Sequence, residues 1–125
     1  MSGNNIVAYT SLLVNFFNGV EPAGKILKDQ HIWVSAITEI ELLSYSGLTK
    51  KQATIIRSFL DECTVTELSP SIRKIAIKVR KKNKLKLPDA VIAATAIYLD
   101  FPLITMDNDF EKVKNLNSIV LETKA

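Results

Sequence analysis

A chain of 125 residues, of which 47% are hydrophobic and 23% charged, can bury the core of one globular domain and is too apolar to stay disordered. Its longest apolar runs are far shorter than a membrane span, so we expect no membrane partner. Cys63 is the single cysteine, which excludes an intrachain disulfide, and the N-terminus lacks the features of a secretory signal, so a cytoplasmic location is expected.

Short apolar runs alternate with helix-like periodic segments along the whole chain, without a linker or an internal repeat. Five of the runs predict buried strands, at residues 6–9, 32–35, 65–68, 103–105 and 119–121. The alternation predicts a single α/β domain over residues 1–125, with a central, mainly parallel sheet of about five short strands flanked by helices.

Several of the expected helices carry start signals. Thr10 or Ser11 could cap a helix that follows the first strand directly, and Thr49 could cap another. Ser69 followed by Pro70 is a favourable start for a third, basic helix. In that helix the apolar residues recur at spacings of three and four and form one stripe: Ile72, Ile75, Ala76 and Val79.

A further helix is expected from about residue 89 to residue 99, after Pro88. It carries a face of mostly small residues: Ala90, Ala93, Ala94 and Ile97. Small side chains allow a helix to approach a sheet closely, so this face is expected to pack on the strands.

Half of the basic residues fall in one segment that contains no acid, residues 69–88. They are Arg73, Lys74, Lys78, Arg80, Lys81, Lys82, Lys84 and Lys86. A stretch of one sign can attract phosphate groups. The alternative is a solvated helix face followed by a basic loop, because short lysine runs are common on protein surfaces.

Acidic side chains follow the ends of several predicted strands. Parallel α/β sheets place their functional groups just beyond the carboxyl ends of the strands. Glu41, Asp89, Asp107 and Asp109 could therefore reach one shared crevice, next to Tyr9 at the end of the first strand. Carboxylate oxygens are the ligands that Mg²⁺ prefers, so these acids are candidates for a metal site.

Each acid also has a purely structural alternative. Asp89 could be a first-turn acid stabilised by the helix dipole, and Asp107 or Asp109 could cap the turn that begins near Phe110. Glu41 could be an exposed helix acid, although its neighbours are apolar.

Four stretches together resemble a known family. The first is the strand and helix start around Tyr9, Thr10 and Ser11, and the second is a Thr-x-x-Glu turn at residues 38–41. The third is Leu-Pro-Asp-Ala-x-Ile-Ala-Ala-Thr-Ala at residues 87–96, and the fourth is Thr-Met-Asp-Asn-Asp-Phe at residues 105–110. In this order and spacing they resemble the PIN-domain ribonucleases, most closely the small VapC-like toxins of bacterial toxin–antitoxin pairs.

The resemblance implies a Mg²⁺- or Mn²⁺-dependent endoribonuclease that an antitoxin holds inactive and that is usually a homodimer. It implies that Glu41, Asp89 and Asp107 bind the metal, and that Asp109 is either the true equivalent of the last acid or an additional acid beside it. Thr10 or Ser11 would orient a water or a phosphate oxygen. The basic segment would contact the RNA backbone.

Tyr9 departs from the family pattern, because the family has an aspartate at this position. A neutral phenol is a poor magnesium ligand, so the expected metal site is missing one of its carboxylates. An alternative is therefore a non-catalytic PIN domain that binds RNA or a protein partner. A receiver-like signalling domain would also place acids at strand ends, but the acidic pair that such a domain needs near its first strand is not visible in the sequence.

Overall fold

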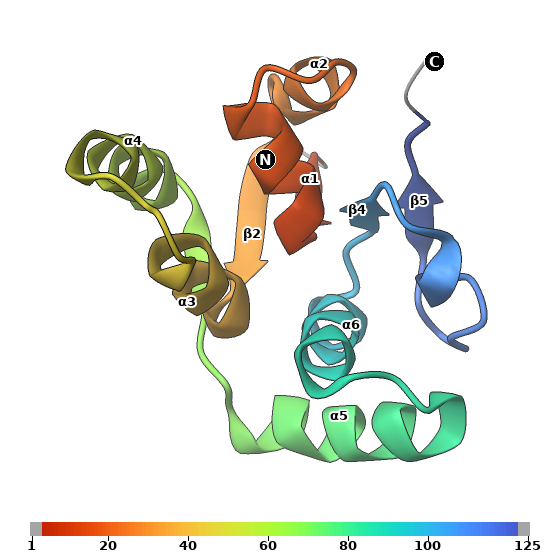
Figure 1. Cartoon of the computed structure of the whole chain (residues 1–125). Helices are drawn as coiled ribbons and strands as arrows, with labels where there is room; N and C mark the ends of the chain where they lie inside the picture. The colour runs from red at the N-terminus through yellow and green to blue at the C-terminus, as the bar shows by residue number, and fades with distance from the viewer. Residues whose placement is uncertain (1–3, 123–125) are drawn as a thin grey trace.

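A five-stranded parallel sheet, in the order β3-β2-β1-β4-β5, organises the chain (Figure 1). The computed structural model describes residues 4–122, so the expected domain extends three residues beyond this part at each end. The strands are β1 (Asn5–Ala8), β2 (His31–Ser35), β3 (Thr64–Thr66), β4 (Leu103–Thr105) and β5 (Ser118–Val120). The predicted parallel α/β architecture is confirmed, and all five predicted strands are present with boundaries within two residues of those expected.

The helices lie on both faces of the sheet, as crossovers between parallel strands require. They are α1 (Thr10–Phe17), α2 (Ala23–Leu27), α3 (Ala36–Ser44), α4 (Lys50–Asp61), α5 (Pro70–Asn83) and α6 (Leu87–Leu99), with a short 3₁₀ turn, η1 (Asn108–Phe110). In Figure 1, α6 lies between the strands and α5, so α5 forms an outer layer. None of the helices within residues 4–122 has the length and apolar character needed to cross a membrane.

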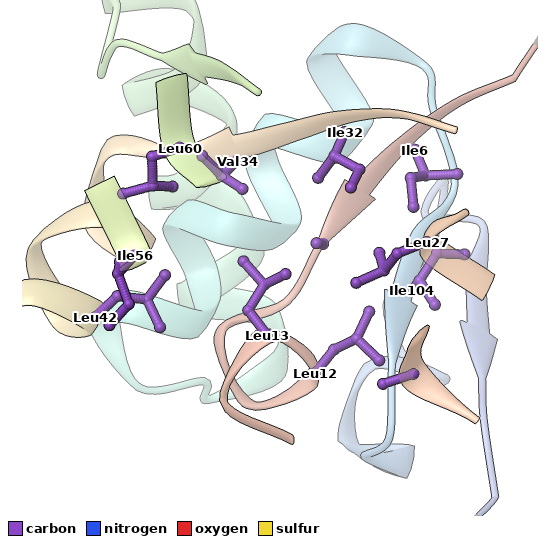
Figure 2. Close-up of a cluster of buried hydrophobic side chains, with 12 residues drawn as sticks. Ile6, Leu12, Leu13, Leu27, Ile32, Val34, Leu42, Ile56, Leu60 and Ile104 are labelled. Carbon is purple, nitrogen blue, oxygen red and sulfur yellow. The ribbon is translucent and has the colours of Figure 1, made fainter. Parts of the chain in front are cut away.

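The alternation of side chains along β1 divides the core into two parts. Ile6 and Ala8 point to one face of the sheet and pack with residues of α1, α2 and α4, as the side chains in Figure 2 show for Ile6, Leu12 and Leu13. Val7 points to the opposite face and packs with Ala90 and neighbouring residues of α6. Successive strand residues face opposite sides, so a strand that is buried on both faces reads as a continuous apolar run.

Local capping signals place the helix starts as the sequence predicts. Ser69 accepts a hydrogen bond from the backbone N–H of Ile72, and Pro70 is the first residue of α5. Thr49 and Gln52 form a reciprocal capping box at the start of α4. These caps satisfy N–H groups that have no partner within the helix.

Helix α6 differs from its prediction in two respects. It begins at Leu87 rather than near residue 89, so that Pro88 lies within its first turn, where the missing proline N–H costs no helical hydrogen bond. The face of small residues is also shared between two neighbours. Ala90 and Ala93 pack towards the sheet as expected, whereas Ala94 packs against α5.

Candidate active site

Tyr9 lies where β1 ends and α1 begins, and both elements fix its backbone. Its N–H donates to the carbonyl of Ile104 in β4 at 3.0 Å, and its carbonyl accepts from Leu12 at 3.1 Å. The ring contacts Phe110 edge to face, with ring centroids 5.0 Å apart. The ring is therefore held at the carboxyl edge of the sheet, where a parallel α/β domain places its functional groups.

The Tyr9 hydroxyl donates a hydrogen bond of 2.7 Å to Oδ1 of Asp89. Asp89 lies in the first turn of α6, where the helix dipole favours a negative charge, as its structural alternative predicted. The carboxylate is half-buried and has the phenol as a partner from a distant segment. Asp89 therefore has two roles: it lies in the first turn of α6, and it accepts a hydrogen bond from the Tyr9 hydroxyl.

Thr10 does not cap α1, because it is the first residue of that helix and Tyr9 occupies the cap position without a side-chain hydrogen bond. The Thr10 hydroxyl instead donates to Oε1 of Glu41 at 2.7 Å. It also lies 3.0 Å from the hydroxyl of Thr38, which is fully buried. Glu41 is therefore not a free surface acid, since a hydroxyl from α1 pairs with it.

Asp107 and Asp109 lie in the turn after β4. Oδ1 of Asp107 accepts from the backbone N–H of Asp109 at 2.9 Å and caps η1, as its structural alternative predicted. The N–H of Asp107 in turn donates to the Thr105 hydroxyl at 3.0 Å. Asp107 is half-buried and Asp109 is exposed, so Asp107 is the better placed of the two to act within the crevice.

The electrostatics of Tyr9 show which acids surround it. Burial, followed by the hydrogen bond to Asp89 and by the charges of Asp89, Asp107 and Glu41, raises the pKa of the phenol well above its usual range. The phenol therefore stays protonated at neutral pH. The three acids come from three separate segments, and each of their charges acts on the same hydroxyl, so the fold brings all three near Tyr9. We call Tyr9, Thr10, Glu41, Asp89 and Asp107 the Tyr9 site.

The Tyr9 site does not fit a divalent cation as it stands. Within residues 4–122, no three Asp, Glu, His or Cys side chains form a group that could hold a metal ion. Asp89 and Glu41 each accept a hydrogen bond from a hydroxyl through one carboxylate oxygen, and the Tyr9 phenol lies near the acids. The ligand roles expected for Glu41, Asp89, Asp107 and Asp109 therefore stay predictions, which a carboxylate at position 9 would test.

The basic segment forms the exposed side of α5 and the loop after it, and six of its eight basic side chains line two hollows. The first is an open groove beside α6, which we call the α5–α6 groove, and it is lined by Arg73, Arg80, Lys81 and Lys84 together with aliphatic residues. The second lies on another side of α5 and is lined by Lys78 and Lys82, with Lys114 from beyond η1. Lys114 is distant in sequence, and no pattern in the basic segment indicated it.

The sequence patterns also did not predict the aliphatic lining of the first groove. Ile77 in α5 and Leu87 in α6 are 60% and 56% exposed, although both are large and apolar. One signal was present in the sequence, because Ile77 falls outside the apolar stripe that runs from Ile72 to Val79. An apolar residue on the polar side of an amphipathic helix indicates a contact beyond the domain core.

Comparison with known proteins identifies the architecture. The PIN domain family matches residues 7–116. A toxin–antitoxin complex from Klebsiella pneumoniae contains a chain with 29% sequence identity and a TM-score of 0.82, over 94% of this chain and 98% of that one. No significant match is found among curated proteins.

Two further solved structures share the fold at lower identity. VapBC2 from Rickettsia felis, bound to a promoter DNA fragment, has a TM-score of 0.83 at 20% identity, over 94% of this chain and 99% of that one. VapBC-5 from Mycobacterium tuberculosis has a TM-score of 0.71 at 15% identity, over 96% and 99%. With the family match over most of its length and this fold, the chain belongs to the PIN-domain family, and its architecture is VapC-like.

Proposed function

We propose that this protein is a VapC-like toxin with the architecture of a metal-dependent endoribonuclease, and that Tyr9 keeps its nuclease site inactive. One observation carries the proposal. The phenol at the position where the resembling family has an aspartate donates a 2.7 Å hydrogen bond to Asp89, with Glu41 and Asp107 close enough to act on its charge state. A protonated phenol supplies no negative charge to a cation.

An aspartate at position 9 would complete the expected set of ligands. In a Tyr9→Asp protein, the new carboxylate would join Glu41, Asp89 and Asp107, with Asp109 in the adjacent turn. Such a set offers the oxygen ligands that Mg²⁺ or Mn²⁺ prefers, and a bound cation of this kind can activate water and neutralise phosphate charge. Thr10, which already holds Glu41 through its hydroxyl, would position that carboxylate.

The proposed substrate is RNA, which the basic segment would attract through its phosphates. Lys78 and Lys82, with Lys114 beside them, line a cationic hollow that no acid among residues 4–122 lines, and they are the side chains we assign to RNA. Lys74 and Lys86 are further candidates on the same segment. The proposed partners also include an antitoxin and a second copy of the chain, and the proposed location is the cytoplasm. The similarity to a chain in a toxin–antitoxin complex supports the antitoxin.

The test is a cleavage assay on structured RNA with Mg²⁺ or Mn²⁺. We expect background cleavage from the natural chain and at least about hundredfold faster cleavage from Tyr9→Asp, because a bound cation supplies the main catalytic effect. Adding Glu41→Gln to Tyr9→Asp should return the activity to background. Tyr9→Phe, which removes the hydroxyl without adding an acid, should stay inactive and serves as the matched control. The Tyr9→Asp protein should also be toxic to a host that lacks the antitoxin.

A second candidate is a non-catalytic PIN domain that binds RNA or a protein. The hydrogen bond between Tyr9 and Asp89 favours this binding function, because Asp89 has a hydrogen-bond partner without a cation. If folded Tyr9→Asp protein cleaves no RNA, the binding domain is the better description. If the natural chain cleaves as fast as Tyr9→Asp, the remaining acids are sufficient and Tyr9 does not inactivate the site.

A further inference from the structure

The second hollow beside α5 combines a rim of lysines with an aliphatic floor. Lys78 and Lys82 come from α5, and Lys114 comes from the segment between η1 and β5. All three side chains are exposed. The floor is formed by aliphatic residues of α5, of α6 and of the segment after η1, namely Ile75, Val79, Ile97 and Val113. The hollow has a volume of about 310 Å³, and we call it the lysine hollow.

The charge of the lysine hollow has one sign, because no acid among residues 4–122 lines it. The dipole of α5 favours a cation such as Lys82 in its last turn. This effect does not account for Lys114, which approaches from a different segment. Positive charges that converge from two segments indicate an anionic ligand, and the compact ammonium group of lysine suits phosphate.

The floor indicates that the ligand is more than a phosphate. Ile75 and Ile97 are partly exposed at the hollow, and covering apolar surface is favourable. A nucleobase has an apolar face and a polar edge, and Asn83 and Asn115 in the same lining offer polar groups to such an edge. The side-chain amide of Asn83 donates to the carbonyl of Val79 at 3.1 Å, so its own carbonyl oxygen can accept from a base.

A row of lysines continues beyond the lysine hollow. Lys74, Lys78 and Lys82 are four residues apart, so they follow one side of α5 at intervals of about 6 Å along the axis. A free nucleotide would occupy only part of this row. A nucleic acid strand, which carries a phosphate at every nucleotide, can contact the row along its length. The row therefore favours a strand over a free nucleotide.

Helix α6 connects the lysine hollow with the Tyr9 site. Asp89 lies in its first turn, and Ile97 lies eight residues later, which is about 12 Å along the helix axis. A stacked strand carries one phosphate per about 3.4 Å, so about four nucleotides cover this length. The lysine hollow is thus separate from the acids but within reach of the same short strand.

We propose that the lysine hollow holds one unpaired nucleotide of the RNA, with its phosphate at the lysine rim and its base on the aliphatic floor. The inference rests on the proposed function, because RNA is the substrate assigned there. It adds a selection that charge alone does not give. A paired base is stacked within its duplex and cannot place its face on the floor, so the hollow selects single-stranded RNA or an unpaired loop.

The test measures binding of fluorescein-labelled RNA to the natural chain by fluorescence anisotropy at one fixed salt concentration. The probes are a short single strand, the same strand paired with its complement, and a strand of equal length that lacks its bases. We expect the first probe to bind at least about tenfold more tightly than the other two, a difference of about 1.4 kcal/mol or more. Charge alone predicts the opposite order for the duplex, which carries more phosphates.

Protein variants locate the binding surface. Lys78→Ala combined with Lys114→Ala removes charge from both segments of the rim and should weaken binding of the single strand by at least about tenfold. Ile97→Ser alters the floor and should reduce the preference for the strand that carries bases. The matched control, Arg80→Ala combined with Lys81→Ala, removes the same charge from α5 at the α5–α6 groove and should weaken binding by less than about threefold. Circular dichroism checks that each variant is folded, and the RNA probes test the proposal without any change to the protein.

Three results would overturn the proposal. The first is equal binding of the single strand and either of the other probes. The second is an equal loss of affinity in the Lys78 and Lys114 pair and in the control pair. The third is a nucleoside 5′-monophosphate that binds the natural chain in titration calorimetry and that the single strand does not displace, because the hollow would then hold a free nucleotide.

These measurements need no cleavage, so they separate the lysine hollow from the nuclease proposal. If Tyr9→Asp cleaves no RNA but the natural chain prefers the single strand with bases, the nuclease proposal fails and the lysine hollow stands. If Tyr9→Asp cleaves RNA and the added changes Lys78→Ala and Lys114→Ala leave both KM and RNA affinity unaltered, the lysine hollow is overturned and the nuclease proposal stands.

Discussion

The Tyr9 site and the α5–α6 groove lie on different sides of the same helix and have opposite electrical character. At the Tyr9 site, acids converge, and hydroxyls from within the chain pair with two of them, Asp89 and Glu41. At the groove, cations border an apolar lining and no acid within the described residues lines the same hollow. The first surface satisfies its polar groups internally, whereas the second leaves its charge and its apolar area open to solvent.

This difference separates a cluster of acids with internal partners from an open apolar and cationic surface within one small domain. At the Tyr9 site, a hydroxyl of the chain donates to one carboxylate oxygen each of Asp89 and Glu41. A surface with exposed aliphatic side chains and unbalanced charge gains free energy when a complementary partner covers it. We therefore expect changes at position 9 to affect cations, and changes around Ile77 to affect protein partners.

Cation binding should show the largest effect. Tyr9→Asp replaces a neutral phenol by a carboxylate, so Mn²⁺ affinity measured by titration calorimetry should rise by at least about tenfold. The melting temperature of this variant should also rise with added Mn²⁺, whereas that of the natural chain should change little, because a ligand stabilises only the state that binds it. Arg80→Glu with Lys81→Glu, introduced into the Tyr9→Asp protein, should leave its Mn²⁺ affinity unchanged. A large change there would show that the two regions are coupled.

The hydroxyl of Tyr9 should stabilise the fold. Tyr9→Phe keeps the ring against Phe110 but leaves Asp89 without its phenol partner, which should lower the free energy of unfolding by about 1–2 kcal/mol. Tyr98→Phe is the matched control, because Tyr98 is exposed on α6 and its change should stay within about 0.5 kcal/mol. Urea unfolding measures both. Equal values for the two variants would mean that the hydrogen bond to Asp89 contributes no net stability.

RNA binding should distinguish the two cationic surfaces. If Lys78 and Lys82 contact phosphate, replacing both by alanine should reduce the slope of log affinity against log salt by about 2, since each such lysine releases about one counterion. Arg80→Ala with Lys81→Ala should alter the slope much less, because these two residues border the α5–α6 groove. Filter binding across a salt series measures the slopes. The reverse order would assign RNA to the groove.

Alkaline pH should have the smallest effect. The pKa of Tyr9 is raised in the fold above its ordinary value of 10.0, mainly by burial and then by the bond to Asp89, so the unfolded chain loses this proton first as pH rises. The associated stability is complete below about pH 10 and is lost as the pH rises towards the folded pKa. The natural chain should thus lose stability above about pH 10 more steeply than Tyr9→Phe in urea unfolding. Parallel pH profiles would show that the phenol has no shifted pKa.

Local sequence signals determined the elements and the identity of most candidate residues. The cap at Ser69 and Pro70, the capping box at Thr49 and the alternating apolar runs act over a few residues, so they could be read directly from the chain. The four motif stretches likewise indicate Glu41, Asp89 and Asp107 as candidates, because residue type and spacing are properties of the sequence.

Only the tertiary structure decided how these residues pair. The Tyr9 hydroxyl meets an aspartate 80 residues away, and the Thr10 hydroxyl meets Glu41 across 31 residues rather than capping its own helix. Strand order and helix packing bring these groups together, and neither is encoded in a local pattern. The α5–α6 groove arises in the same way, since Ile77 and Leu87 belong to different helices and share a surface only after α5 packs on α6. The sequence by itself determined which side chains are available and in which elements they lie. The packing of distant segments decided which of them meet and which remain exposed, because those contacts depend on the whole fold.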